Sequence, residues 1–258
     1  MSEIFAIITQ KGGVGKTTTV NALAASFKKI GKKVLCVDMD PQGNLSFSMG
    51  AETEESLTVF DAICGTSRVG SCIQHTELTD ILPSNILLTG AELEFTGKNR
   101  EYILKNVLGV VEDDYDIILI DSPPGLGFLT INALSACNYV IIPMLPDIFS
   151  LQGLVQVYET IEFIKQGSNP DLEIMGIIIN KFNKFIKLHR EALGTAQMVS
   201  ENFNIPIFET HVHNAEKLSE AQSLQLDIFE YCPKCSGVKD YFKIANEILS
   251  KINSRGEV

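Results

Sequence analysis

Hydrophobic residues in this chain form short continuous runs, separated by stretches in which apolar residues recur with helical spacing. The continuous runs predict strands covered on both faces, which need no polar alternation. The intervening stretches predict helices, and Val20, Leu23, Ala24 and Phe27 mark the first of them. The predicted strands are 4–8, 34–37, 116–120, 139–143, 174–179 and 206–208, and the later predicted helices are 151–165, 190–202 and 238–252.

The order of these elements predicts an α/β fold with a mostly parallel, twisted sheet and helices on both faces. No linker rich in Pro or Ser divides the chain, so residues 1–258 are expected to form a single domain that ends in a helix over 238–258. Residues 50–100 are less regular and carry several glycines. We interpret them as a peripheral insertion between core strands, or equally as a short edge hairpin.

The segment between the first strand and the first helix predicts a phosphate-binding loop, and with it a P-loop NTPase. Glycines let backbone amides approach phosphates, and the start of a helix favours an anion. Lys16 adds a full charge near the β- and γ-phosphates, and Thr17 offers a hydroxyl to Mg²⁺. A simple glycine turn does not account for the whole string, which is Lys11, Gly12, Gly13, Val14, Gly15, Lys16, Thr17 and Thr18.

Aspartates follow two of the predicted strands at the edge where parallel sheets bind ligands. Asp121 ends a continuous apolar run and is expected to hold Mg²⁺, partly through water. Asp38 and Asp40 end the second strand before Pro41. A turn before proline is the ordinary interpretation of such a pair, but a phosphate loop nearby favours a catalytic one.

The lysine that precedes the glycines, Lys11, resembles the deviant Walker A motif of the ParA/MinD family of ATPases. The resemblance implies that Lys11 reaches the phosphates of a partner subunit and that ATP drives formation of a homodimer. Asp40 lies in a string similar to the family's D-x-D-P-Q-x-N, which implies that it orients or activates the attacking water, with Asp38 nearer the Mg²⁺. The segment 121–124 is similar to the family's D-x-P-P.

Further segments resemble the short ParA/Soj partition ATPases over nearly the whole chain. Glu209-Thr210, then 218–223 with Gln222 in place of proline, and 229–237 are similar to family motifs. The resemblance implies slow hydrolysis of ATP to ADP and phosphate with Mg²⁺, stimulated by a centromere-binding ParB-like partner. It also implies partition of plasmid or chromosomal DNA in the cytoplasm, in association with the nucleoid. Because the chain begins directly on a strand, no N-terminal helix-turn-helix is expected.

Two positions resemble contacts to the base of the nucleotide. Asn180 follows the strand at 174–179, where the family places a polar adenine contact, although a strand-end turn is its plain interpretation. His213 replaces a family proline that helps to line the base pocket. We expect both residues to bind the cofactor.

The net charge of −11 at first argues against a nucleic-acid partner. Residues 1–180, however, hold 11 basic and 22 acidic residues, whereas residues 181–258 hold 10 of each. A basic run in this neutral part is either a solvated lysine face or a surface for non-specific DNA binding. The resemblance favours DNA, with Asn214 in the place of a usual arginine, and the expected DNA-binding residues are Lys181, Lys184, Lys187, Arg190 and Lys217.

Other functions remain as alternatives. A MinD-like ATPase that acts at a membrane surface would use a basic amphipathic terminal helix, but the polar face of 238–258 mixes Lys with Asp and Glu. A positioning ATPase for a cargo other than DNA is a second alternative. The Cys232-Pro-Lys-Cys235 string is interpreted as a tolerated replacement. The alternatives are a zinc site, completed by His211 and His213 or by a partner subunit's cysteine pair, and a redox pair.

Overall fold

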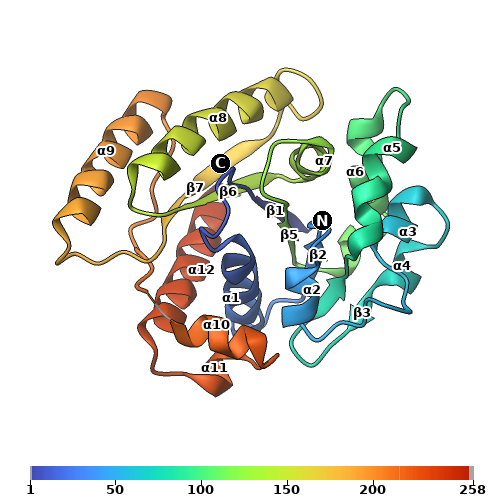
Figure 1. Cartoon of the computed structure of the whole chain (residues 1–258), viewed down its shortest axis with the longest axis horizontal. Coiled ribbons are helices and arrows are strands. Elements are labelled where there is room, and N and C mark those ends of the chain that lie inside the picture. The colour runs from blue at the N-terminus through green and yellow to red at the C-terminus, as the bar shows by residue number, and fades with distance from the viewer. Residues whose placement is uncertain (1, 215, 256–258) are drawn as a thin grey trace.

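One seven-stranded sheet runs through the protein, in a computed structural model that describes residues 2–214 and 216–255 (Figure 1). The strand order is β3-β4-β2-β5-β1-β6-β7, and every neighbouring pair is parallel except β3 with β4. This confirms the predicted mostly parallel sheet. The strands are β1 (Glu3–Ile7), β2 (Val34–Asp38), β3 (Gln74–His75), β4 (Asp80–Leu82), β5 (Ile117–Asp121), β6 (Tyr139–Met144) and β7 (Glu173–Ile179).

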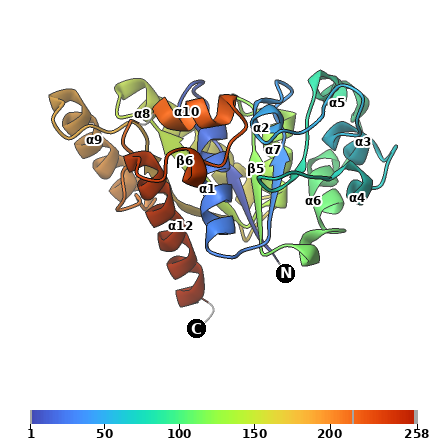
Figure 2. The same cartoon turned by 90° about the horizontal axis from the view of Figure 1, so that it is seen from below.

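Helices cover both faces of this sheet (Figure 2). They are α1 (Lys16–Lys29), α2 (Asn44–Ser48), α3 (Val59–Cys64), α4 (Val69–Cys72), α5 (Ala91–Glu94), α6 (Ile103–Leu108), α7 (Phe128–Ala136), α8 (Ile148–Lys165), α9 (Lys187–Phe203), α10 (Glu216–Ser223), α11 (Ile228–Tyr231) and α12 (Ser236–Arg255). Short 3-10 turns lie at η1 (Ile86–Gly90), η2 (Arg100–Tyr102) and η3 (Glu112–Asp114).

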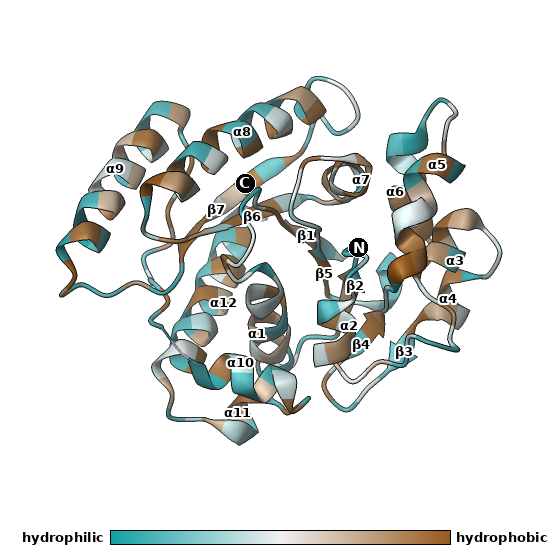
Figure 3. Cartoon of the chain, viewed as in Figure 1, coloured by the Kyte–Doolittle hydropathy of each residue, from teal (hydrophilic) through white to brown (hydrophobic). Residues whose placement is uncertain are grey.

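Successive side chains of the central strand β1 enter two different cores, because neighbouring residues of a strand face opposite sides of the sheet. Phe5 and Ile7 pack in a core with residues of α1, α10, α11 and α12. Ile4, Ala6 and Ile8 pack in a second core that takes in residues of α7 and α8. Figure 3 shows brown, apolar positions along the strands and along the helices around them. The continuous apolar runs of the sequence are explained by this burial on both faces.

Residues 50–100 are part of the sheet. They supply β4, which pairs in parallel with β2, and β3, which pairs with β4 in the antiparallel direction at the sheet edge. This is the geometry that the hairpin interpretation expects. Strand β4 is only three residues long and β3 only two, so no apolar run in the sequence predicts them.

The prediction of a strand at 206–208 is wrong. The structure has one parallel bridge there, between Ile177 and Ile207, and no continuing ladder. Pro206 has no N–H to donate, and the bonds to β7 run only from Ile177 to Pro206 and from Phe208 to Ile177. Pairing of this segment with β7 is therefore limited to one bridge.

The other predicted helices are present, with shifted ends. Helices α8 and α9 each begin three residues earlier than predicted, so Lys187 and Arg190 both lie on α9. The terminal prediction corresponds to α12, while residues 256–258 lie outside the described part of the chain. Helix α7 escaped prediction because it is buried almost all round and lacks a polar face. Among the described helices, none has the length and apolarity needed to cross a membrane.

Candidate nucleotide site

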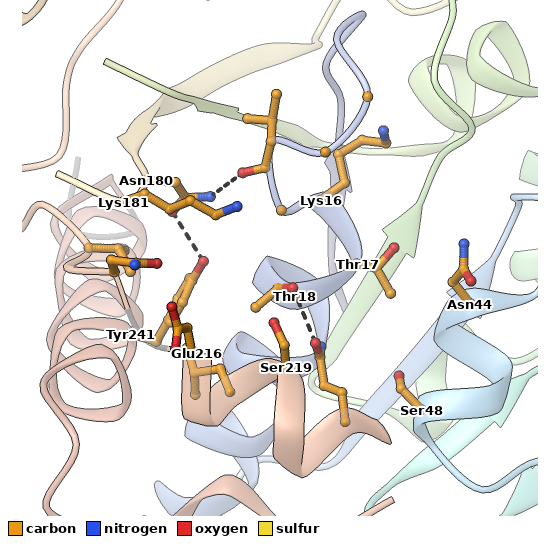
Figure 4. Close-up of a pocket in the computed structure, with 18 of the residues that line it drawn as sticks. Lys16, Thr17, Thr18, Asn44, Ser48, Asn180, Lys181, Glu216, Ser219 and Tyr241 are labelled. Carbon is orange, nitrogen blue, oxygen red and sulfur yellow. Dashed lines mark hydrogen bonds between the residues drawn. The ribbon is translucent and has the colours of Figure 1, made fainter. Parts of the chain in front are cut away.

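A cleft of about 1120 Å³ opens at the carboxyl ends of the parallel strands, where an open α/β sheet binds its ligands (Figure 4). Segments far apart in sequence line it, among them the loop before α1, the segment from β2 to α2, the end of β7, α10 and α12. Its lining includes Gly12, Gly13, Val14, Gly15, Lys16, Thr17, Thr18, Asp40, Asn44, Ser48, Asn180, Lys181, His213, Glu216, Ser219 and Tyr241. Most of the predicted cofactor residues are thus brought together.

The loop between β1 and α1 presents open backbone amides to this cleft. Gly13 and Gly15 have φ angles of 74° and 97°, which L side chains adopt only with strain. A Cβ at Gly15 would also lie 3.2 Å from the amide nitrogen of Asn180. Gly15 is the N-cap residue of α1 and has no side chain that could accept hydrogen bonds from the first turn. The backbone N–H groups of this turn are therefore available to an anionic ligand.

Lys16 and Thr17 start α1 and connect it to the end of β5. Lys16 is 9% exposed, and this burial lowers the pKa of its ammonium, against the opposing attraction of Asp121 and Asp40. The Thr17 hydroxyl donates a hydrogen bond of 2.6 Å to Oδ2 of Asp121. Oδ1 of Asp121 is buried and has no protein partner. A carboxylate oxygen left free beside a threonine hydroxyl is a donor set that suits Mg²⁺.

Asp38 lies beside Asp121 in the register of β2 and β5. Burial raises the pKa of both carboxyls. The negative charges of Asp38 and Asp40 raise the pKa of Asp121 further, and that of Asp40 raises the pKa of Asp38. Asp38 Oδ1 accepts from the backbone N–H of Asp40, and Oδ2 accepts from the N–H and the hydroxyl of Ser46. Both of its oxygens therefore shape the loop after β2, and its predicted role near the metal stays a prediction.

Asp40 follows β2 and is 7% exposed, with its side chain on the lining of the cleft. Its Oδ1 accepts a hydrogen bond of 3.0 Å from the N–H of Gln42, so the turn before α2 sets its orientation. Its charge acts on Lys16. Its predicted role in orienting the attacking water stays a prediction.

Lys11 does not line the cleft. Its ammonium lies 2.7 Å from Oδ2 of Asp147, the residue that caps α8, and 5.7 Å from the centre of the Phe149 ring. Both partners of this ion pair are about one-third exposed. The sequence analysis did not identify Asp147 as a partner of Lys11, because the two residues are far apart in the sequence and Asp147 has the pattern of an ordinary helix N-cap.

Asn180 belongs to a buried polar network that connects β7, the phosphate loop and α12. Its amide nitrogen donates to the carbonyl of Val14 at 3.0 Å, and its Oδ1 accepts from the hydroxyl of Tyr241 at 3.1 Å. The Tyr241 hydroxyl also lies 2.9 Å from the hydroxyl of Thr19. The sequence analysis gave Tyr241 no role in the site. The only sequence signal is a tyrosine at a core position.

His213 lines the same cleft from the segment before α10, and its orientation comes from α12. Its backbone N–H and its Nδ1 are hydrogen-bonded to Oδ2 of Asp240, at 3.0 Å and 2.8 Å. Asp240 is buried, while the imidazole side chain is 56% exposed. Nearby, Thr18 donates a hydrogen bond of 3.2 Å to Gln222 of α10.

The predicted DNA-binding residues are exposed near the mouth of the cleft. Lys181 and Lys184 lie in the loop after β7, and the guanidinium of Arg190 donates to the carbonyl of Lys184 at 2.7 Å. Lys187 lies 3.3 Å from Glu191 on the same helix. Lys217, on α10, lies 2.6 Å from Glu220. Two of the five basic residues thus already face a carboxylate.

The zinc alternative for the cysteine pair finds no support over residues 2–214 and 216–255, where no three or more His, Cys, Asp or Glu are grouped to hold a metal ion. All six cysteines are free thiols.

Comparison with known proteins agrees with the fold and the cleft. Residues 2–174 match the family model described as AAA domain. The chromosome-partitioning ATPase Soj of Treponema pallidum is 38% identical over 99% of this chain and 100% of its own length. The sporulation initiation inhibitor protein Soj of Bacillus subtilis is 38% identical over 97% of this chain and 99% of its own. A solved cobyrinic acid a,c-diamide synthase of Mycobacterium smegmatis, with bound ADP and magnesium, superposes with a TM-score of 0.86 at 31% identity, over 98% and 96% of the two chains.

The fold and the site together define a P-loop ATPase. Within that class, the chain belongs to the ParA/MinD family, in which its curated relatives include the Soj and ParA chromosome-partitioning ATPases.

Proposed function

We propose that this protein is a Mg-ATP-dependent ATPase switch that dimerises with ATP and then binds DNA without sequence specificity, so as to partition or position it. The observation that carries the proposal is the composition of the cleft. It brings together the uncapped N-terminus of α1, the Lys16 ammonium and the hydrogen-bonded pair of Thr17 and Asp121. Curated partition ATPases match at 36–38% identity over at least 97% of this chain, which favours a partition function.

The residues of the cleft divide the work of phosphoryl transfer to water between them. The amides of the loop and of the first turn of α1 hold the phosphates, and the Lys16 ammonium neutralises charge that grows on them. Thr17 and Asp121 would hold Mg²⁺, which when bound supplies further positive charge at the phosphates. Asp40 orients the attacking water. Asn180 and His213 line the part of the cleft that accepts the base.

Dimerisation would involve Lys11. In the single chain its ammonium pairs with Asp147, outside the lining of the cleft. Contact with the phosphates of a second subunit requires that Lys11 leave this partly exposed partner, and an ion pair at the surface costs little to break. The ATP state is favoured because only it offers a γ-phosphate to both subunits. Hydrolysis then returns the monomer.

DNA binding would rest on backbone electrostatics, with Lys181, Lys184, Lys187, Arg190 and Lys217 as the contacting residues. Such a surface needs local positive charge and tolerates an acidic total. We expect the protein to act in the cytoplasm on the nucleoid, with slow hydrolysis that a ParB-like centromere-binding protein accelerates.

The experiment that tests the proposal uses Asp40→Ala, which should bind ATP and not hydrolyse it. With ATP and Mg²⁺, this variant should form dimers and bind random-sequence DNA at low salt. The same variant with ADP, and Lys16→Ala with ATP, are the controls that should not bind. Absence of DNA affinity in a dimeric, ATP-loaded Asp40→Ala protein would refute the DNA function and leave the ATPase in place.

The membrane alternative is not supported by the terminal helix. Tyr241, Ile244 and Ile248 form the apolar face of α12 and are buried in the core shared with α1. A helix that must lie in a membrane interface needs that face free.

A further inference from the structure

A tight turn between α11 and α12 brings together two cysteines that the proposed ATPase mechanism does not use. The backbone N–H of Cys235 donates to the carbonyl of Cys232 at 3.0 Å, and the N–H of Lys239 donates to the carbonyl of Cys235 at 3.3 Å. Cys235 therefore stands at the start of α12, one turn from Cys232. Burial raises the pKa of the Cys232 thiol to about 12.

The two thiols differ in access. Cys235 is partly exposed, whereas Cys232 is 9% exposed and belongs to the core around α12. An incoming reagent therefore meets Cys235 first and finds Cys232 behind it. No other two of the six cysteines lie within three residues of each other in the sequence. Cys64 is the other partly exposed cysteine, and it lies on α3.

The turn is connected to the nucleotide cleft on two sides. The hydroxyl of Tyr231 donates to Glu220 of α10 at 2.8 Å, and α10 lines the cleft with Ser219. On the other side, the first turns of α12 carry Asp240 and Tyr241. These two side chains hold the His213 imidazole and the Asn180 amide described above. A movement of Cys235 is therefore transmitted to groups that line the cleft.

We propose that Cys232 and Cys235 form a reversible dithiol–disulfide site, which reacts with small-molecule disulfides and loosens the nucleotide cleft when it is oxidised. The Cys235 sulfur, as thiolate, attacks one sulfur of the reagent, whose S–S bond breaks and releases one thiolate. The Cys232 thiol then gives up its proton and attacks the Cys235 sulfur, which releases the second thiolate. The protein loses two electrons and two protons, and the reagent is reduced to two thiols.

The effect on the cleft follows from geometry and rests on the proposed function. Both cysteines are free thiols in the structure, so their sulfurs lie farther apart than the disulfide bond length of about 2 Å. Closing that gap pulls the start of α12 toward Cys232, since the buried sulfur is held in the core. Asp240 and Tyr241, one turn further along, then shift away from their partners. Oxidation should therefore weaken binding of ADP and ATP several-fold.

The chemistry is tested on the full-length protein with oxidised glutathione as the probe, followed by intact-mass and peptide analysis. Wild type should lose two hydrogen masses and yield a peptide cross-linked between Cys232 and Cys235, and reduction should restore it. Cys232→Ala should stop at a glutathione adduct on Cys235. Cys235→Ser should remain unreacted at Cys232, and Cys64→Ser should behave as wild type. A wild-type chain without the internal cross-link, or an adduct that forms on Cys232 in Cys235→Ser, overturns the site.

The coupling is tested by measuring ADP affinity of the reduced and the oxidised protein. Weaker binding after oxidation, with no change in the Cys232→Ala/Cys235→Ser double variant under the same treatment, supports it, and equal binding overturns it. If the reduced wild type binds no nucleotide at all, the proposed function fails, whereas the mass measurement still decides the disulfide. The two failures are therefore distinguishable.

Discussion

At the residue scale, Asp121 shows how a functional position conflicts with stability. Its carboxylate is fully buried beside Asp38, and only one of its two oxygens has a partner. A bound cation resolves this conflict. Without one, the folded protein must either carry an unfavourable charge or take up a proton at this carboxyl. The residue is therefore suited to a cofactor and costs stability in the empty cleft.

Asp121→Asn should stabilise the nucleotide-free protein by about 1–2 kcal/mol at neutral pH and abolish Mg²⁺-dependent hydrolysis. Burial raises the pKa of Asp121, so the wild type loses stability as pH rises from the ordinary aspartate pKa through the raised one. The gain of the variant should thus shrink between about pH 8 and about pH 5. Thermal unfolding across this range measures it, and a gain that grows toward acid would contradict the argument.

Gly176 is a second residue whose identity is dictated by its surroundings. Its φ is 155°, and an added Cβ would lie 3.0 Å from both the Phe208 ring and the carbonyl oxygen of Pro206. Gly176→Ala should lower the free energy of unfolding by about 1–3 kcal/mol, through strain and overpacking. Urea unfolding measures the loss. Gly194→Ala, on α9 with no atom within 4 Å of its Cβ, is the control and should not destabilise.

At the scale of elements, α12 contributes to both the core and the site. One face is buried against α1, and Tyr241 on that face carries its hydroxyl to the end of β7 and the first turn of α1. The hydroxyl oxygen of Tyr241 thus connects α12, the end of β7 and α1. The helix positions the cleft as well as closing the core, so changes to it should affect both folding and binding.

Tyr241→Phe should destabilise the protein by about 1–3 kcal/mol, because it leaves Oδ1 of Asn180 without its donor inside the protein. It should also weaken nucleotide binding, since Asn180 holds the phosphate loop at Val14. Chemical unfolding and ADP titration measure the two effects. Tyr158→Phe, which keeps the ring packed on Phe203 away from the cleft, is the matched control. Equal nucleotide affinity of both variants would show that the network only supports folding.

At the scale of the whole molecule, charge is divided between two parts of the chain. The excess of acid lies in residues 1–180, and the exposed basic residues 181–190 lie beside the cleft in the neutral remainder. The proposed electrostatic attraction to DNA would therefore be confined to a small surface of the molecule. Such binding weakens steeply as salt rises.

Lys184→Ala should weaken DNA binding of the ATP-loaded dimer by a similar factor on every DNA sequence. It should reduce the slope of log affinity against log salt by about one for each lysine lost. Lys98→Ala, an exposed lysine in the 50–100 segment, should leave both quantities unchanged. Titrations of random-sequence DNA at several salt concentrations provide the slope, and equal slopes for the two variants would place the DNA surface elsewhere.

Prediction from sequence succeeded where one short segment contains all the necessary information. The phosphate loop and the buried strands are of this kind, because periodicity and glycine positions act locally. It failed for 206–208, where Pro206 has no N–H to donate and pairing with β7 is limited to one bridge. It also failed for α7, which is buried almost all round and therefore has no polar face in its sequence. Asp147 and Tyr241 were missed because their partners lie more than fifty residues away.

The sequence by itself determined the chemistry of the loop, since Lys16, Thr17 and the amides before them are contiguous and take their geometry from the start of one helix. It also determined the alternation of elements that makes the sheet parallel. Only the tertiary structure decided that Asp38 lies beside Asp121, that Lys11 pairs with Asp147, and that the Cys232–Cys235 turn reaches the cleft through α10 and α12. These contacts depend on how separate elements pack, and packing is a property of the whole fold.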